Sequence, residues 1–337
     1  MNESWRIYGA EMSPYSVKVR AYFRYKGIAH RWIVRTGERM AEFGALAKLP
    51  LIPLVVDPQG VAAQDSTPVI EAVEARHPAP SIHPEDPVAA FASALLEEYG
   101  DEWGNKWMFH LRWAREADQL AGASRIARTI EPDADEARHL ALAAQVRERM
   151  VGRVGFVGSN AGTAPIIEAS FVDALRLLET HLEQRPYLFG ARPAFADFAL
   201  WAQVRSAFTD PTGYGIVANR TPGVLDWIAR MEWPRDEGPF EDWTSLEPTL
   251  GPLLRAEIAD RFLPWSVANA AAIVAGRDEF TVALADGPWT QVPQKYHARS
   301  LARLRERHAA SPARADVDAM LARWNCLDAL VADTPTG

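Results

Sequence analysis

Cysteine and long apolar runs are both scarce in this sequence. Cys326 is the only cysteine among 337 residues, which excludes an internal disulfide framework and a metal cluster bound by cysteines alone. Charged side chains interrupt the first thirty residues, and no stretch approaches the roughly 20 consecutive apolar residues that span a bilayer. We therefore expect neither a signal peptide nor a membrane segment, and a reducing cytoplasm is the simplest location.

Motifs for metal, nucleotide and serine-hydrolase chemistry are also missing. The chain has no H-E-x-x-H, no G-x-S-x-G and no glycine-rich phosphate loop, and its eight histidines are scattered. Its formal net charge of −8 disfavours nucleic-acid binding. We expect no metal, no nucleotide cofactor and no nucleic-acid partner.

What is present is a globular composition, with 48% hydrophobic and 24% charged residues. The length allows two packed domains with an appendage. The twelve tryptophans indicate large buried surfaces or aromatic pockets.

Residues 1–80 read as a compact α/β domain with one small mixed sheet. Short runs of β-branched and aromatic residues predict four strands, and a breaker-free segment after Ser13 predicts a helix. Pro58-Gln59-Gly60 separates the last two strands, which indicates an antiparallel hairpin. A helix from residue 66 ends the domain. The strands are expected at residues 5–10, 31–35, 52–57 and 60–65.

A proline-rich linker at 78–87 leads to an all-helical domain over 87–235. Residues 236–337 form an extension. There, Asp286-Gly287 within 279–292 predicts a β-hairpin, and amphipathic helices follow it. The helices of the second domain are expected at 88–120, 135–151, 165–185, 194–208 and 222–231, and those of the extension at 295–309 and 317–331.

Ser13 and Pro14 begin the first helix, and two roles are open for Ser13. Serine at the N-cap followed by proline is a common way to start a helix. The free N–H groups and the positive end of the dipole at such a site also favour an anion, and would favour the thiolate of a bound thiol.

Two further segments carry similar alternatives. Pro53 either begins an edge strand with a trans peptide or follows a cis bond that leaves the Ile52 backbone free for a peptide-like ligand. Ser66 either caps the helix that it opens or grips a ligand carboxylate, with Asp65 taking an adjacent ammonium.

The order of these signals resembles the thioredoxin-like domain of cytosolic glutathione transferases. "SPYSVKVRAYFRYKGI" is similar to the segment in which that family has Ser or Cys first and Lys-Gly-Ile last. "RPYLFGARPAFADFALWAQV" is similar to the helical-domain signature around a buried aspartate, here Asp197, and "TPGVLDWIARM" to the closing helix. The resemblance covers roughly residues 5 to 235.

The resemblance implies glutathione as co-substrate and assigns roles to individual residues. Ser13 would hydrogen-bond the glutathione sulfur, and Ile52 would pair with the cysteinyl backbone beside cis-Pro53. Asp65 and Ser66 would hold the γ-glutamyl end. Lys48 is a candidate for the glycyl carboxylate.

The second substrate would be a small hydrophobic or aryl electrophile bound against the first helix of the helical domain. Tyr99, Trp103, Lys106, His110 and Trp113 recur there at helical spacing. Core packing is the alternative for most of them. The side chains expected to line the pocket are Tyr15, Trp103, Trp107 and His110.

The chain departs from the family in having Ala194 where Ser or Thr usually caps the helix of Asp197, so we expect Asp197 to bond backbone groups differently. Family members with cysteine at the position of Ser13 form mixed disulfides, and Cys326, distant and expected to be buried, offers no substitute. Isomerase relatives resemble Ser-Ser-Cys at this point, unlike Ser13-Pro14-Tyr15.

The leading hypothesis is a transferase that conjugates glutathione, cleaves ethers thiolytically or dehalogenates. The alternative is a non-catalytic relative that binds a ligand or a protein. A homodimer is expected from the resemblance. The extension is left open between a pocket cover, a dimer contact and a docking surface, although Phe262, Trp265 and Val267 indicate packing onto the body.

Overall fold

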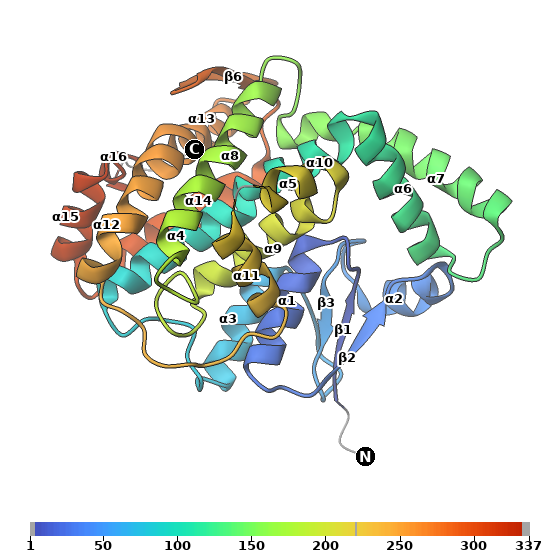
Figure 1. Ribbon diagram of the computed structural model, residues 1–337, viewed down its shortest axis with the longest axis horizontal. Helices are drawn as coiled ribbons and strands as arrows, with labels where there is room; N and C mark the ends of the chain where they lie inside the picture. Colours follow the sequence, from blue (N-terminus) through green and yellow to red (C-terminus); the bar gives the residue numbers. More distant parts are fainter. Residues whose placement is uncertain (1–3, 220, 332–337) are drawn as a thin grey trace.

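The computed structural model describes residues 4–219 and 221–331 of the chain. A small sheet with its helices lies at one end, and a large group of helices is packed above it (Figure 1). The fold is a small α/β domain followed by a helical domain, with further helices and a two-stranded sheet from the extension.

The N-terminal sheet has four strands in the order β2-β1-β3-β4. β1 (Trp5–Gly9) pairs in parallel with β2 (His30–Val34) and antiparallel with β3 (Leu54–Val56). β4 (Ala62–Gln64) pairs antiparallel with β3. The mixed sheet and its hairpin are confirmed.

Helix α1 (Pro14–Tyr25) has Ser13 as its N-cap and buries most of its side chains between the sheet and the helical domain. Helix α3 (Ser66–Arg76) lies beside it. Between β2 and β3 the chain forms a short 3-10 turn, η1 (Gly37–Arg39), and helix α2 (Met40–Leu46), where the sequence predicted only a connection.

The helical domain contains every helix predicted for it, with different breaks. The segment predicted as one helix over 88–120 divides at Trp103 and Arg115. In Figure 1, α6 and α7 project from the body as an antiparallel arm. The elements are α4 (Pro87–Glu102), α5 (Gly104–Ala114), α6 (Glu116–Ile130), α7 (Glu136–Val151), η2 (Val154–Val157), α8 (Ala164–Leu182), α9 (Phe195–Phe208), α10 (Pro211–Ala218) and α11 (Pro222–Met231).

Asp197 is fully buried in the first turn of α9, and its carboxylate joins α9 by hydrogen bonds to three other points of the helical domain. Its Oδ2 accepts from the Ala194 N–H at 2.9 Å. Its Oδ1 accepts from the Leu188 N–H and from Trp227 Nε1, each at 2.9 Å. As expected, the carboxylate bonds backbone groups without a hydroxyl at position 194.

The extension adds helices and a two-stranded sheet to the helical domain. Its hairpin turns at Asp286, as predicted, whereas the helix predicted over 317–331 divides at Asn325, where φ is 59°. The elements are α12 (Trp243–Leu253), a π-helical segment η3 (Leu254–Phe262), α13 (Leu263–Val274), β5 (Phe280–Leu284), β6 (Gly287–Gln291), α14 (Lys295–Ala309), α15 (Arg314–Arg323) and α16 (Leu327–Val331).

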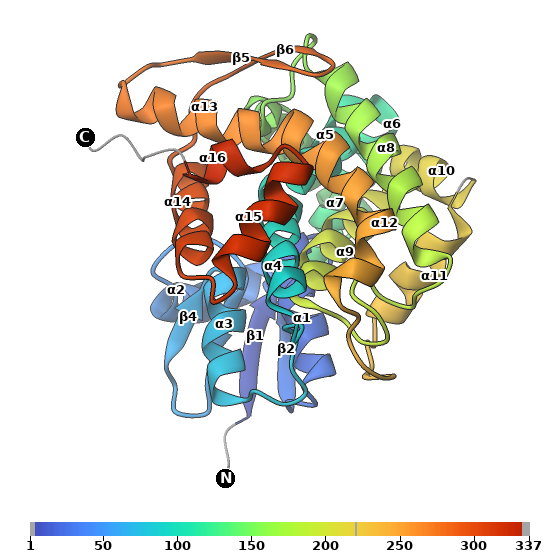
Figure 2. The same ribbon diagram turned by 90° about the vertical axis from the view of Figure 1, so that its left-hand side faces the viewer.

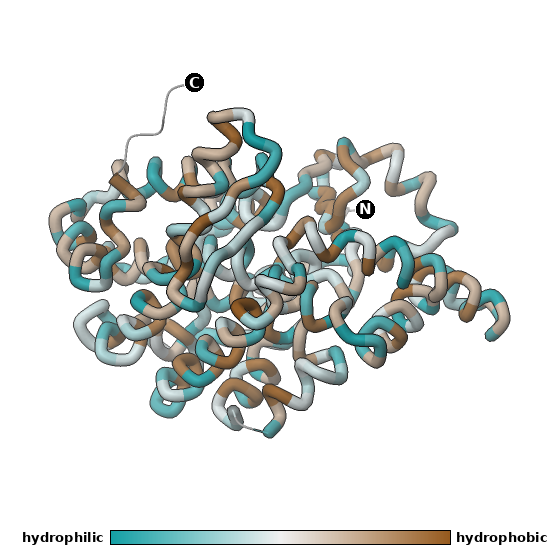
Figure 3. The backbone as a smooth tube through the Cα atoms, turned by 90° about the horizontal axis from the view of Figure 1, so that it is seen from above, coloured by the Kyte–Doolittle hydropathy of each residue, from teal (hydrophilic) through white to brown (hydrophobic). Residues whose placement is uncertain are grey.

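The extension and the helical domain share one core. The Trp103 ring lies 5.7 Å from that of Trp265 and 5.2 Å from that of Trp289, centroid to centroid. Tyr99 packs edge-on against Phe262 at 5.9 Å. Figure 2 shows α14 and α15 lying over α4. Figure 3 shows apolar and polar residues alternating along the backbone of the whole molecule. The predicted packing of the extension onto the body is therefore confirmed.

Candidate functional site

Ser13 is the N-cap of α1 and is half-buried. Its Oγ accepts from the Ser16 N–H at 3.3 Å, and its own N–H bonds the Ala10 carbonyl at 3.1 Å. Capping uses the hydroxyl oxygen only as an acceptor. The O–H proton has no acceptor among the described residues, so capping and donation to a ligand are compatible.

The loop that carries Ser13 is fixed from the helical domain by Arg112. This buried guanidinium donates to the Met12 carbonyl at 2.9 Å and to the Ser206 carbonyl at 3.0 Å. Its Nε donates to Asp210 Oδ2 at 2.7 Å, which places the ion pair inside the protein. Arg112 was not identified from the sequence, where it is one arginine among many.

The segment that approaches β3 leaves peptide groups free. The Ile52–Pro53 bond is cis, one of the two conformations considered. No hydrogen bond reaches the Ile52 backbone among the described residues. The Gln64 side chain braces the preceding loop by accepting from the N–H of Lys48 and Leu49 and donating to the carbonyl of Leu51. The Lys48 side chain is exposed.

Asp65 and Ser66 stand where β4 passes into α3. Asp65 is the N-cap and has a φ of 79°, a region that aspartate tolerates better than most residues. Ser66 is the first helical residue and makes no capping bond, so the capping interpretation of Ser66 is wrong. The Ser66 hydroxyl has no partner among the described residues.

The Asp65 carboxylate meets the extension. Its Oδ2 accepts from the Tyr296 hydroxyl at 2.8 Å. Burial raises the pKa of Asp65, although the Tyr296 hydroxyl and the nearby Lys18 ammonium favour its ionised form. Nothing local in the sequence indicates this contact.

A buried charge cluster joins the helices that begin at Ser13 and Ser66. Lys18 Nζ of α1 lies 2.5 Å from Glu97 Oε1 and 2.6 Å from Asp101 Oδ2, both of α4. It also bonds Thr67 Oγ1 of α3 at 2.9 Å. Burial opposes the charge on Lys18, but the two carboxylates outweigh it and raise the pKa of the ammonium. The cluster fixes the two helix starts relative to each other.

Three of the four residues predicted to line an electrophile pocket, Trp103, Trp107 and His110, are buried in the protein and do not line an accessible surface. Trp103 and Trp107 have no exposed surface, and both indoles donate to Ser170 Oγ, at 2.8 and 2.9 Å. Core packing, the alternative left open from the sequence, describes them. His110 is also buried, between Ser159 Oγ and Glu168 Oε1.

Tyr15 is the predicted pocket residue nearest in sequence to Ser13. It is half-buried, donates to the Asp101 carbonyl at 3.0 Å and accepts from Asn105 Nδ2 at 3.3 Å. Burial and then the Asp101 charge raise its pKa well above the ordinary value, so the phenol is neutral at physiological pH. Its pocket role stays a prediction.

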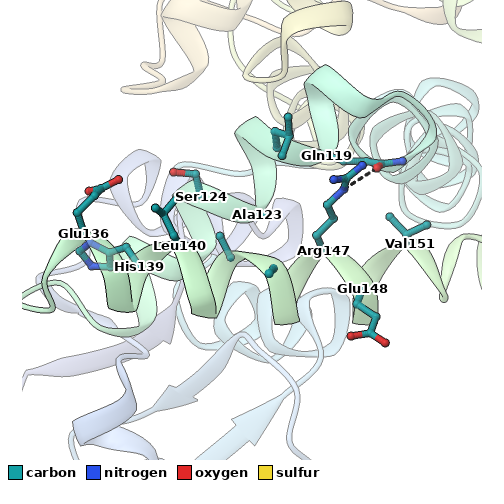
Figure 4. A pocket seen from close by; sticks show the side chains of 12 residues that line it. Gln119, Ala123, Ser124, Glu136, His139, Leu140, Arg147, Glu148 and Val151 are labelled. Atoms are coloured by element: carbon teal, nitrogen blue, oxygen red, sulfur yellow. Dashed lines mark hydrogen bonds between the residues drawn. The ribbon is translucent and has the colours of Figure 1, made fainter.

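A surface groove of about 710 Å³ lies elsewhere, between α6 and α7 (Figure 4). Leu120, Leu140 and Ala144 contribute to its apolar lining, and Arg147 bonds Gln119 at 2.9 Å at its edge. None of the predicted site residues lines it.

Two other findings concern the described residues alone. No three histidine, cysteine or acidic side chains are grouped there in a way that would bind a metal ion. None of the helices in these ranges combines the length and apolarity needed to cross a bilayer.

Two family models match the chain. The model described as "Glutathione S-transferase, N-terminal domain" matches residues 7–81, and "Glutathione S-transferase, C-terminal domain" matches residues 136–230. The ranges span 75 and 95 residues, which together exceed half of the 337. No curated protein matches the chain in sequence.

Solved structures are similar at low sequence identity. A glutathione S-transferase from Methylobacterium radiotolerans in complex with glutathione sulfonate has 19% identity, covers 71% of this chain and 97% of its own, and has a TM-score of 0.40. One from Rhodospirillum rubrum has 19% identity, coverages of 73% and 91%, and a TM-score of 0.44. A beta-etherase from a Sphingobium species has 16% identity, coverages of 68% and 95%, and a TM-score of 0.44.

Proposed function

This chain belongs to the glutathione S-transferase superfamily, and we propose that it is a glutathione-dependent transferase in which Ser13 stabilises the glutathione thiolate. The observation that carries the proposal is the Ser13 hydroxyl at the start of α1, whose oxygen caps the helix while its proton has no acceptor among the described residues. The sulfur of a bound thiol would supply that acceptor.

One hydrogen bond is enough to change the ionisation of the thiol. A free thiol has a pKa near 8.5, so roughly 3% is thiolate at neutral pH. A hydrogen bond to a charged group contributes about 1.5–3 kcal/mol, which lowers the pKa by roughly one to two units. The thiolate fraction then rises to between about a quarter and three-quarters. Neither a general base nor a covalent enzyme intermediate is required.

The rest of the tripeptide would lie along the N-terminal domain. The free backbone groups of Ile52 suit the cysteinyl peptide. The Asp65 carboxylate suits the γ-glutamyl ammonium, and the Ser66 hydroxyl and helix N-terminus suit its carboxylate. Lys48, exposed on the neighbouring loop, suits the glycyl carboxylate.

The electrophile would be a small hydrophobic or aryl molecule. Conjugation, thiolytic ether cleavage and dehalogenation share the same attack of sulfur on carbon. A panel of aryl halides, alkyl halides and aryl ethers, each assayed with and without glutathione, separates these reactions by product.

The test is ultraviolet titration of bound glutathione, in which thiolate absorbance is followed against pH. We expect the parent to lower the thiol pKa by about one to two units, and Ser13→Ala to restore it. For a reactive electrophile at neutral pH, kcat of Ser13→Ala should fall about 8- to 25-fold, the ratio of the two thiolate fractions, while glutathione affinity changes little. Ser16→Ala is the matched control, because the Ser16 hydroxyl is buried on the same helix without a partner among the described residues.

Two outcomes would count against the proposal. An unshifted thiol pKa in saturated parent protein would favour the alternative of a glutathione-binding module without turnover. Equal thiol pKa values for Ser13→Ala and the parent would remove Ser13 from the mechanism.

A further inference from the structure

The predicted glutathione site is in contact with a part of the chain that lies outside both family matches. Tyr296 is the second residue of α14 and lies 231 residues after Asp65, and its hydroxyl donates to Asp65 Oδ2 at 2.8 Å. The Tyr296 side chain is 51% exposed, so its ring is not held there by burial in the core. Its defined polar partner is the carboxylate.

The helix behind Tyr296 is anchored firmly on the two helices that flank Asp65. His297 and Ser300 both bond the buried Glu102 of α4, the serine at 3.0 Å. Arg303 and Arg307 pair with Glu71 of α3. The His297 ring also packs on Trp265 at 4.9 Å. These contacts fix the position of α14, and therefore that of Tyr296 beside Asp65.

The contact leaves room for a ligand at the same carboxylate. An ionised aspartate offers about four acceptor positions on two oxygens, and Tyr296 takes one of them on Oδ2. No side chain among the described residues donates to Oδ1. A hydroxyl on one oxygen fixes the rotation of the carboxylate and favours its charge, which are the two properties that an incoming ammonium requires.

We propose that Tyr296 of the C-terminal extension is a positioning residue of the glutathione site, which holds the Asp65 carboxylate for the γ-glutamyl ammonium. The inference rests on the proposed function, because it takes glutathione as the ligand. The extension would then contribute a side chain to ligand recognition, in addition to covering α4.

The experiment is calorimetric binding of two probes to the full chain and to Tyr296→Phe. The probes are glutathione and its des-amino analogue, glutaryl-cysteinylglycine, which lacks only the ammonium. We expect Tyr296→Phe to weaken glutathione binding about three- to ten-fold and to leave binding of the analogue unchanged. Tyr214→Phe is the matched control, since Tyr214 is 57% exposed and its hydroxyl has no partner among the described residues.

The pH dependence supplies a second readout. Burial raises the pKa of Asp65, with Glu102 of α4 adding to it, while the Tyr296 hydroxyl, Lys18 of α1 and the Thr67 N–H lower it. Removing the hydroxyl raises that pKa further. Glutathione affinity of Tyr296→Phe should therefore begin to fall at a higher pH than that of the parent as the solution is acidified.

Each other outcome overturns the inference. Unchanged or tighter glutathione binding by Tyr296→Phe would show that the hydroxyl does not assist the ligand. Equal weakening for both probes would show that Tyr296 acts only by docking the extension. A parent protein that binds neither probe would contradict the proposed function itself.

Discussion

Replacing Arg112 by methionine tests how firmly the Ser13 loop is tied to the helical domain. Methionine keeps most of the buried stem and removes the guanidinium, which joins the Met12 carbonyl, the Ser206 carbonyl and Asp210. The Asp210 side chain has no exposed surface and would keep only Arg125, whose side chain is 35% exposed.

The expected loss follows from these contacts. Removing one partner of a buried ion pair costs about 3–5 kcal/mol, and the lower end applies because Arg125 remains. The Met12 carbonyl loses its donor, at about 1 kcal/mol, whereas the Ser206 carbonyl keeps the Thr209 hydroxyl at 2.8 Å. Arg112→Met should therefore lower the free energy of unfolding by about 4 kcal/mol, a large part of the 5–15 kcal/mol typical of folded proteins.

The assay is urea unfolding at pH 7, followed by tryptophan fluorescence. The double variant Arg112→Met with Asp210→Asn also removes the buried carboxylate charge that has lost its main partner. Its loss of unfolding free energy should be about 2 kcal/mol smaller than the sum of the losses of the two single variants. A loss below about 1 kcal/mol for Arg112→Met, or strict additivity in the double variant, would refute the argument from burial. In folded Arg112→Met, the thiol pKa of bound glutathione should also rise. The reason is that no guanidinium then holds the Met12 carbonyl, and with it the loop before Ser13.

Two further predictions concern stability and reactivity. Ala194→Ser adds the missing cap hydroxyl to the helix of Asp197 and should stabilise the protein by about 0.5–1 kcal/mol in the same urea assay, whereas a loss would show that the buried site has no space for the oxygen. Burial raises the pKa of the Cys326 thiol to about 12. Iodoacetamide at pH 8 should therefore leave Cys326 unlabelled in the folded protein and label it in urea, as measured by mass spectrometry. Rapid labelling of the folded protein would contradict the burial.

Local patterns account for most of the fold that the sequence predicted. Alternation and turn residues indicated the β3–β4 and β5–β6 hairpins, and Ser13-Pro14 indicated the start of α1. Helix α12 was missed because Pro248 and Pro252 lie inside it, and an interior proline removes a helical hydrogen bond. Burial of Leu246 and Leu250 against the body outweighs that local penalty.

The candidate site was predictable only where its residues stand at the ends of secondary-structure elements. Ser13, Ile52 and Asp65 precede or open elements, and such positions leave a signal in the sequence. Lys18 and Tyr296 act through contacts with residues 49 or more positions away, and their neighbours along the chain do not indicate these partners. Trp103 had the spacing expected for either a pocket or a core, which a helical period alone does not distinguish.

The tryptophan packing between body and extension also affects how the chain can be made. A nascent polypeptide that has left the ribosome only as far as α11 would expose the faces of Trp103 that later meet Trp265 and Trp289. Glu102 would likewise face water until His297 and Ser300 are synthesised. Final consolidation of the helical domain must therefore wait for the last part of translation, and a stop codon placed after α11 should yield an insoluble product rather than a smaller working enzyme.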